Sequence, residues 1–564
     1  MGLALLEKAN PNLMKPLYQR LGVAFLVLLS FQVSATTYYV DVNSTSPTPP
    51  YTNWVTAATN IQDAIDAANA GDFIMVTNGI YNSGGRVVFG TMTNRVVINK
   101  VVTVQSVNGP VSTVIEGTRN ANVPPTGIRC VYLTNGAALI GFTMTNGATR
   151  NTGDISQEQS GGGAWCNDSS VVISNCVFAG NSTARYGGGA YQGTLFNCTF
   201  TNNSAAYGGG AASNALFGCT LIRNTAMFQN NNYGGGADGC VLSNCLIVGN
   251  QSTAGGGFGG GAAFSVLTGC VISNNSAGGN GGGVFMGAAN ISLISNNRAY
   301  YGGGAYSNML NNCVLKNNVA NNAGGGAYNS VLIGCTVVSN AVADGGGIWG
   351  GAATNCIIYY NRGDNIENSK LIAYTCSFPL GTITNAPLFV NLAGGDFHLQ
   401  TNSPCINSGN NAYATGATDL DGNPRIVGGT VDMSAYEFQS PSSVLSYAWA
   451  QQYGLPTDGS ADFIDSDGDD MNNWREWRTG TIPTNSSSLL QMMSPAFTNN
   501  PSGVTVTWQS VSGVNYFIQR SSDLGAQPPF STIQSNIVGQ TGTTSYTDTN
   551  AVGNGPFFYR VGVQ

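Results

Sequence analysis

The sequence predicts an all-β protein built around a right-handed parallel β-helix. Nine copies of one cassette recur in the middle of the chain. Most carry a glycine triplet, and each has a cysteine or serine followed five residues later by an asparagine. The steps between the cysteine positions are 22, 21, 26, 25, 22, 21, 22 and 21 residues. A period this short that tolerates insertions is typical of a stacked solenoid. The cassette is rich in Gly, Asn, Ser, Thr, Val and Ile, which favours short strands and tight corners over helices.

Two positions of the cassette predict columns that run along the solenoid. The cysteine position holds Cys176, Cys198, Cys219, Cys245, Cys270, Ser292, Cys313, Cys335 and Cys356, and the asparagine position holds Asn181, Asn203, Asn224, Asn250, Asn275, Asn297, Asn318, Asn340 and Asn361. Residues two apart on a strand share a face, so Cys198 and Phe200 are expected to point inward together. We expect each asparagine amide to bond to the equivalent amides in the coils above and below.

The thirteen cysteines are expected to be mainly thiols. Cysteines at one position of every coil point the same way and pack as small apolar side chains. An exported chain with this many cysteines would otherwise suggest disulfides, and Cys376 and Cys405, outside the strict register, are the better candidates for one. A cysteine or histidine metal site is disfavoured, because the chain has no CxxC pair and one histidine, His398.

Length and composition agree with a multidomain solenoid. The 564 residues leave room for more than one domain. Only 8% are charged, far below the usual share of about a quarter. The net charge of −7 gives no reason to expect a nucleic-acid partner, since nucleic-acid binding favours basic patches. A monomer is expected.

Residues 1–35 are predicted to be a signal peptide. Three basic residues precede the apolar run Leu21–Leu29, and Val33–Ala35 offers a small-residue cleavage site. An uncleaved membrane anchor is the alternative, but the run is short for a membrane span. No later stretch has the length and apolarity of a span. We therefore expect an extracellular or outer-membrane-surface protein.

Residues 36–82 are predicted to cap the solenoid. Thr37–Val42 and Phe73–Val76 have strand patterns, and between them Ala57–Ala70 has helical spacing. Such a helix would cover the open end of the first coil. The stretch resembles the entry cap of pectate-lyase-like β-helix proteins, which implies the pectin-lyase fold for residues 83–440.

Two further resemblances cover the solenoid. The GGGA and NCxFxxN patterns of Gly187–Ala190 and Asn197–Asn203 are similar to the repeats of chlamydial polymorphic outer membrane proteins. Ser403–Cys405, Asp419–Arg425 and Val431–Glu437 resemble the closing segment of exported β-helix proteins with a choice-of-anchor ending. The resemblances imply fold and export. They say little of activity, because this architecture serves lyases, hydrolases, adhesins and inert stalks alike.

No convincing catalytic constellation is visible, so the catalytic residues are unknown and we favour a non-catalytic protein. The repeat acids Asp168, Asp238 and Asp344 are isolated, and His398 lies in a strand-like context without a nucleophile motif. One alternative stays open. The loops 118–128 and 147–160 could bring five charged residues onto one wall, as in a polysaccharide lyase or glycoside hydrolase: Arg119, Arg129, Arg150, Asp154 and Glu158.

An aromatic residue follows two positions after most glycine triplets, and these side chains are expected to face outward. They are Trp165, Tyr191, Phe285, Tyr306, Tyr328 and Trp349. A flat aromatic column could hold sugar rings. The competing interpretation is that the rings stack on one another and shield the strands. Ala212 and Asp238 interrupt the column.

Residues 441–487 are predicted to form a linker with a short helix at Ser443–Tyr453 and a calcium loop. Oxygen-bearing side chains fall at the first, third, fifth, ninth and twelfth loop positions, and the seventh would give its carbonyl: Asp465, Asp467, Asp469, Asn473, Glu476 and Met471. The loop resembles those of dockerin-like linkers. It departs from them at Asp470, where glycine normally permits a sharp turn. A solvated acidic linker is the alternative.

Residues 488–564 are predicted to form a small β-sandwich with Trp508, Tyr516 and Tyr559 in its core. The segment resembles fibronectin type III-like modules. Taken together, the sequence predicts an exported, non-catalytic surface or matrix protein for adhesion or polysaccharide binding, with calcium in its linker. The alternative is a pectate-lyase-like polysaccharide lyase or hydrolase.

Overall fold

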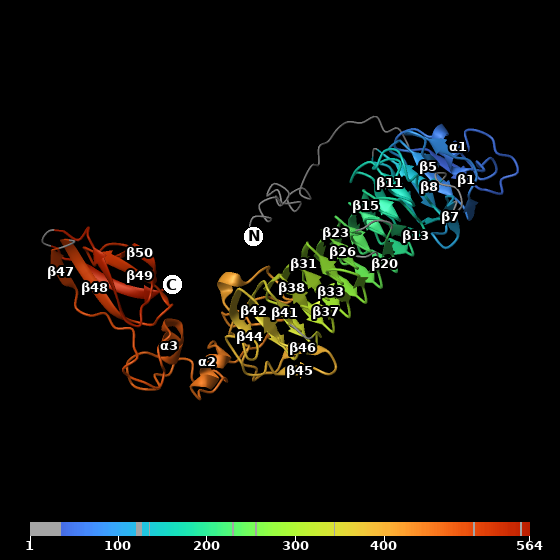
Figure 1. Ribbon diagram of the computed structural model, residues 1–564. Helices are drawn as coiled ribbons and strands as arrows, with labels where there is room; N and C mark the ends of the chain where they lie inside the picture. The colour runs from blue at the N-terminus through green and yellow to red at the C-terminus, as the bar shows by residue number, and fades with distance from the viewer. Residues whose placement is uncertain are drawn as a thin grey trace.

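The computed structural model describes residues 35–119, 127–134, 136–227, 231–253, 256–342, 345–499, 502–552 and 555–564. All of the predicted signal peptide except Ala35 lies outside the described residues, and so does Asp344. Figure 1 shows a rod-shaped solenoid with a cap at its N-terminal end, followed at the other end by the short helices α2 (Tyr447–Gln452) and α3 (Asn473–Thr479) and a separate small β domain. Among the described residues, no helix combines the length and apolarity needed to span a membrane.

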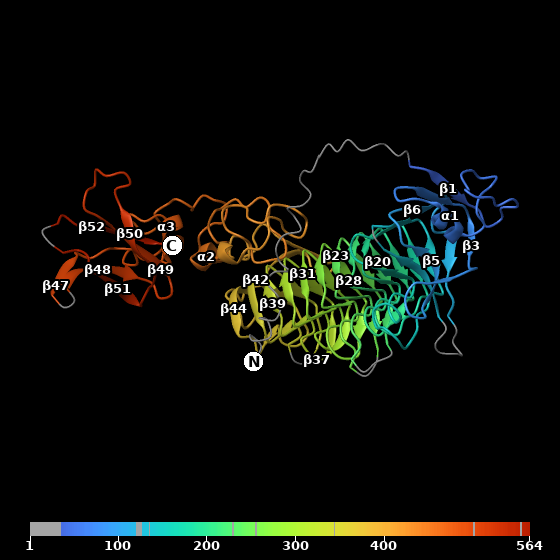
Figure 2. The ribbon, with the colours of Figure 1, turned by 90° about the horizontal axis from the view of Figure 1, so that it is seen from above.

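The predicted right-handed parallel β-helix is confirmed, and each coil contributes to stacked ladders of parallel strands (Figure 2). One ladder follows the glycine triplets and carries the aromatic residues. It contains β4 (Arg86–Val87), β5 (Thr93–Ile98), β8 (Ile128–Leu133), β11 (Ala164–Cys166), β14 (Ala190–Tyr191), β18 (Ala211–Ala212), β22 (Ala237–Asp238), β26 (Ala262–Ala263), β30 (Val284–Phe285), β34 (Ala305–Tyr306), β38 (Ala327–Tyr328), β41 (Ile348–Trp349) and β43 (Ile366–Glu367). Within it only β4 pairs in the antiparallel sense.

A second ladder precedes the cysteine corner. Its strands are β1 (Thr37–Val40), β2 (Phe73–Val76), β6 (Thr103–Ser106), β9 (Ala138–Ile140), β12 (Val172–Ser174), β15 (Thr194–Phe196), β19 (Ala215–Phe217), β23 (Val241–Ser243), β27 (Val266–Thr268), β31 (Ala288–Asn290), β35 (Met309–Asn311), β39 (Val331–Ile333), β42 (Ala352–Tyr359) and β44 (Leu371–Cys376). The middle residue of most of these short strands is buried, so one column of side chains fills the solenoid.

A third ladder follows the cysteine corner and merges with the second at β42. It contains β3 (Gly79–Tyr81), β7 (Thr113–Glu116), β10 (Thr143–Thr145), β13 (Val177–Ala179), β16 (Thr199–Thr201), β20 (Thr220–Ile222), β24 (Leu246–Val248), β28 (Val271–Ser273), β32 (Leu293–Ser295), β36 (Val314–Lys316) and β40 (Thr336–Val338). A fourth, shorter ladder contains β17 (Ser204–Ala205), β21 (Thr225–Ala226), β25 (Gln251–Ser252), β29 (Ser276–Ala277), β33 (Arg298–Tyr301) and β37 (Val319–Ala323). Cys198 and Phe200 are both buried, as predicted.

The predicted asparagine ladder is present along the corner before the fourth ladder. The Asn250 Nδ2 donates to Asn275 Oδ1 at 3.0 Å and to the carbonyl of Leu221 at 2.9 Å, and the Asn250 backbone N–H also donates to Asn275 Oδ1. Equivalent bonds link the members from Asn181 to Asn361, and Asn365 accepts the last one. The ladder therefore satisfies corner backbone groups that no strand partner reaches.

The glycine triplet has a steric cause, as the coil at Gly208 to Gly210 shows. Gly208 has a positive φ of 63°, which disfavours a side chain. A Cβ on Gly209 would lie 2.4 Å from the carbonyl oxygen of Gly235 in the next coil. Only glycine allows neighbouring coils to approach this closely.

The cysteine column consists of buried thiols. The Cys198 backbone N–H donates to Cys219 Sγ at 3.4 Å, and that thiol donates to the carbonyl of Leu195. Burial raises the pKa of Cys313 and Cys356 in this column, which disfavours the reactive thiolate. Cys376 and Cys405 are free and buried as well, so a disulfide between them is not formed.

Thiol titration of the fully denatured protein without reductant is expected to find all thirteen cysteines as thiols. The reason is that the column lies in the dry core, where thiolate and oxidant are both excluded. A sample reduced before denaturation is the control and should give the same count. A deficit of an even number of thiols, restored by reductant, would contradict the packing account.

The N-terminal cap and the closing segment both cover apolar surface. Helix α1 (Ile61–Ala67), shorter than predicted, buries Ile61 and Ile65 against the first coils. The closing segment contains β45 (Phe389–Asn391), β46 (Asp396–Leu399) and a short 3₁₀ turn at Asn411–Tyr413. It packs on the outer face of the third ladder, and its buried Arg425–Glu437 ion pair of 2.9 Å locks its own loops together. This side-on packing was not predicted.

Two short helices and then a small antiparallel β domain follow the closing segment. The linker holds α2 (Tyr447–Gln452) and α3 (Asn473–Thr479). Two three-stranded antiparallel sheets then share one core, and their strands are β47 (Ala496–Asn499), β48 (Ser502–Ser510), β49 (Asn515–Ser521), β50 (Ser531–Val538), β51 (Gly542–Asp548) and β52 (Phe558–Val563). Trp508, Tyr516 and Tyr559 are buried in that core, as predicted.

Candidate functional site

Arg129 is one of the five charged residues considered as a possible catalytic group, and its guanidinium is hydrogen-bonded entirely within the protein. Its guanidinium donates to the carbonyls of Gly161, Gln157 and Ser160 and to Asn94 Oδ1. Its exposed fraction is 1%, and burial lowers its pKa to about 9. A side chain held by four internal acceptors has a structural role and does not face a substrate.

Glu158 and its neighbours fasten the loop 147–160 to the cap. The Glu158 carboxylate accepts the backbone N–H groups of Thr91 and Asp154, and these bonds lower its pKa. Asp154 in turn accepts from the backbone of Gln157, and Arg150 donates to the carbonyl of Thr91. The fold thus brings Arg150, Asp154 and Glu158 together, but it commits them to loop closure, while Arg119 is exposed.

His398 joins two carboxylates at the surface of the closing segment. Its Nδ1 lies 2.6 Å from Asp396 Oδ1, and its Nε2 lies 2.6 Å from Asp421 Oδ2. Burial acts to lower the pKa of His398, but the bonds to Asp421 and Asp396 outweigh it and raise the pKa above 6.5. The histidine therefore cross-links β46 and the 419–425 loop.

Replacing His398 with glutamine is expected to lower the thermal midpoint more at pH 5.5 than at pH 8.5. Because the folded-state pKa is raised, the imidazolium stabilises the protein below about pH 6.5, and this contribution is lost as the pH rises through the folded pKa. The side chain is 46% exposed, so the effect should stay below about 1 kcal/mol. Differential scanning fluorimetry at both pH values measures it. An equal loss at the two pH values would contradict the ion-pair interpretation.

The predicted aromatic column exists, and its rings stack on one another. The Tyr306 and Tyr328 centroids are 5.0 Å apart with an interplanar angle of 2°, and Tyr328 and Trp349 are 4.5 Å apart at 8°. Trp165 and Phe285 are buried, and Trp165 Nε1 donates to the carbonyl of Ser156. The ring faces between successive coils are therefore occupied, and the ring edges point outward.

A second aromatic column, not predicted, fills the interruption at Ala212 and Asp238. Its members immediately precede the glycine triplets, and they are Tyr186, Tyr207, Tyr233 and Phe258. Tyr191 meets Tyr186 at 5.8 Å at one end, and Phe285 meets Phe258 at 4.9 Å at the other. The repeated aromatic-glycine pair could have indicated this column. Together the two columns make one aromatic ridge, from Tyr132 to Trp349.

The segment predicted to bind calcium, residues 465–476, begins after α2 and runs into the first turn of α3. Oxygens of Asp465, Asp467 and Asp469 lie within 4.8 Å of one another. Asp465 accepts the backbone N–H groups of Gly468 and Asp470, which bends the loop around its own first residue. The oxygens of Asp467 and Asp469 that lie close to Asp465 are not needed for this bend.

Several oxygens of this loop are buried without a hydrogen bond of normal geometry. They are both oxygens of Asp467, Asp469 Oδ2, Asn473 Oδ1 and Glu476 Oε2. Asn473 and Glu476 are fully buried. Burial, followed by the charges of Asp467 and Asp469, raises the pKa of Glu476 to about 7. Unpaired buried oxygens are costly, and a hard cation with oxygen ligands would satisfy them, so the residues present fit calcium.

Asp470, the departure from the expected loop pattern, adopts the conformation that glycine would supply. Its φ is +71°, in the left-handed region that aspartate tolerates better than most residues. The turn thus forms with a non-glycine residue at a cost of about 1 kcal/mol. Asn473 Nδ2 donates to the carbonyl of Ala461, which directs its Oδ1 away from that contact.

Comparison with known proteins finds similar solved structures at low identity. No protein-family description and no curated protein matches it. Among solved structures it is similar to a pectate lyase, Pel9A, with a TM-score of 0.34 and 16% identity over 72% of this chain and 98% of that chain. For a rhamnogalacturonan lyase the TM-score is 0.31, with 13% identity over 64% of this chain and 92% of that chain. For a pectin methylesterase from Erwinia chrysanthemi the TM-score is 0.24, with 13% identity over 50% of this chain and 80% of that chain. At such low scores the likeness does not extend to function.

Proposed function

We propose that this protein is an exported rod of the cell surface or extracellular matrix, which binds a polysaccharide or adheres to a surface glycan without transforming it. The observation that carries the proposal is the group of buried, unpaired oxygens in loop 465–476, between the solenoid and the terminal domain. Extracellular calcium modules work at about 10⁻⁴ to 10⁻³ M calcium. A calcium ion there would order the joint of an exported rod.

Binding is favoured over catalysis because the candidate catalytic side chains are hydrogen-bonded within the protein. Arg129 and Glu158, which a lyase or hydrolase would need at a substrate, are engaged with backbone groups. The aromatic ridge offers edges and tyrosine hydroxyls to an extended ligand. It does not offer free ring faces, so any glycan held there would lie along the ridge.

A glycan array with the chain from residue 36 onward, in about 1 mM calcium, tests the proposal. Retention is expected, with the chain length of the bound glycan unchanged. Replacing Tyr306, Tyr328 and Trp349 together by alanine should abolish retention by the ridge. The control is Phe196→Ala, which removes an exposed aromatic of the second ladder. Calcium-dependent release of unsaturated sugars from polygalacturonate or alginate would overturn the non-catalytic role.

A further inference from the structure

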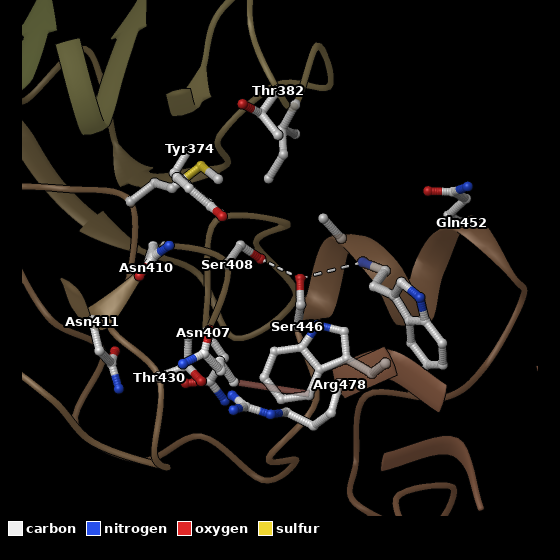
Figure 3. A pocket seen from close by; sticks show the side chains of 17 residues that line it. Tyr374, Thr382, Asn407, Ser408, Asn410, Asn411, Thr430, Ser446, Gln452 and Arg478 are labelled. Carbon is white, nitrogen blue, oxygen red and sulfur yellow. Dashed lines mark hydrogen bonds between the residues drawn. The ribbon is translucent and has the colours of Figure 1, made fainter. Parts of the chain in front are cut away.

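A cleft of about 610 Å³ lies where the end of the solenoid, the linker and the C-terminus meet (Figure 3). One wall comes from β44 and the closing segment, with Tyr374 and Asn410. The facing wall comes from the helices, with Trp449 on α2 and Trp477 and Arg478 on α3. This volume is ordinary for a small-molecule site. The cleft lies apart from the aromatic ridge.

The lining of the cleft has the chemistry of a sugar site. Three aromatic side chains, Tyr374, Trp449 and Trp477, stand among amides and hydroxyls, and Arg478 is the lining residue with a charged side chain. Aromatic faces pack against the apolar side of a sugar ring, and a guanidinium pairs with a carboxylate. The surroundings therefore favour a sugar that carries negative charge.

Several polar groups of the cleft are unused by the protein. The side chains of Tyr374, Thr430, Gln452 and Arg478 make no hydrogen bond or ion pair with the described residues. Asn407 is fully buried, and its Oδ1 has no hydrogen-bond partner. In Figure 3 the Arg478 side chain extends toward Thr430 and Asn407, whereas Ser408 and Ser446 bond to each other at 2.7 Å. Unused donors and acceptors that line a cavity are available to a ligand.

Helix α3 connects the cleft to the calcium loop. Within its seven residues it carries Asn473 and Glu476, each with a buried oxygen that has no hydrogen-bond partner, followed directly by Trp477 and Arg478. Asp462 ties this region to the start of α2, because it accepts from Ser443 Oγ and from the backbone of Val444. The position of one cleft wall therefore depends on whether the loop is ordered.

We propose that the cleft binds an acidic oligosaccharide, with Trp477 against a sugar ring and Arg478 on its carboxylate, and that calcium in loop 465–476 holds this wall in place. The calcium dependence rests on the calcium site proposed above, whereas the cleft itself stands on its own lining. The inference adds a second glycan site, independent of the ridge, and gives it a charge preference.

Isothermal titration calorimetry of the chain from residue 36 onward with trigalacturonate, in about 1 mM calcium, tests the proposal. Trp477→Ala and Arg478→Gln are each expected to weaken binding by about tenfold or more, because they remove the anchor and the charge partner. The matched controls are Trp474→Ala and Arg475→Gln, on the same helix but outside the cleft, which should bind like the parent protein. Neutral galactotriose should bind more weakly and be insensitive to Arg478→Gln.

The dependence of sugar binding on calcium is tested with a substitution in loop 465–476 at constant calcium concentration. The calcium concentration itself is not varied, because calcium also binds free galacturonate. Asp467→Asn should weaken trigalacturonate binding by about tenfold. The proposal that the cleft binds the sugar would be overturned by either of two results. One is equal binding by the Trp477 and Arg478 variants and their controls, and the other is no binding of trigalacturonate at all. If the Arg478 variant weakens binding but Asp467→Asn does not, the calcium coupling is overturned. A separate titration with calcium alone then shows whether the proposed calcium site fails too.

Discussion

Asn275→Ala is expected to destabilise the solenoid by about 3 to 5 kcal/mol. The side chain donates to the carbonyl of Ile247 and to Asn297 Oδ1, and it accepts from both nitrogens of Asn250. All of these groups lie at a buried corner. Alanine would leave several buried donors and acceptors without partners, each costing about 1 to 3 kcal/mol. Equilibrium denaturation followed by circular dichroism measures the loss.

Two further variants separate hydrogen bonding from volume. Asn275→Asp keeps the shape but replaces both amide donors by a buried charge, so it should also destabilise, and more at pH 8 than at pH 4. The control is Asn274→Gly, at an exposed neighbour with a φ of +56° that glycine accepts, and it should change stability by less than about 0.5 kcal/mol. A loss for Asn275→Ala no larger than the control's would show that the ladder is not a major stabilising feature.

Calcium is expected to raise the unfolding midpoint of the linker, and Glu476→Gln is expected to stabilise the metal-free protein and to remove its response to calcium. Without calcium, burial and neighbouring carboxylates raise the pKa of Glu476 from 4.5 to about 7, so the ionised form opposes folding at neutral pH. Glutamine removes that penalty and should stabilise the metal-free protein by as much as about 3 kcal/mol. With calcium at about 100 times its dissociation constant, the parent protein gains about 2.7 kcal/mol, a gain that the variant should lack.

The controls for this prediction come from the same segment. Asp458→Asn removes an exposed acid outside the loop and should leave the calcium response unchanged. Asp470→Gly relieves the left-handed aspartate and should bind calcium at least as tightly. Fluorimetry with and without calcium measures the change in stability and the response to calcium, and calorimetry on the full chain measures calcium binding. No heat at millimolar calcium, or destabilisation by Glu476→Gln in the metal-free protein, would contradict the site.

The coil architecture was predictable because it repeats. Glycine is required wherever a neighbouring backbone lies within 3 Å of a would-be Cβ, as at Gly209, and this requirement recurs in most of the glycine triplets. The asparagine ladder is equally local: the offset of five from the cysteine position places Asn275 at the same corner as Asn250. The loop at Asp465 was readable for the same reason, since the spacing of its oxygens lies within twelve consecutive residues.

Features built from distant segments were not predictable in the same way. The closing segment covers the third ladder because Val314 and Val338 are apolar on the outside, but nothing near them in sequence identifies Phe389 or Met433 as their cover. The cleft likewise unites Tyr374 with Trp477, a hundred residues apart. Arg129 looked like a candidate for catalysis because its charge is visible in the sequence, whereas its four internal acceptors are not.

Short-range pattern therefore established the coil and the buried columns, since each depends on spacings of a few residues repeated along one axis. It also pointed to the loop oxygens that we propose as calcium ligands. Folding in three dimensions assigned the roles of individual side chains. It turned the aromatic residues into a self-stacked ridge, converted Arg129 and Glu158 into internal fasteners, and placed Arg478 in a cleft. Those outcomes depend on which surfaces meet and exclude water, and that information is spread over the whole chain.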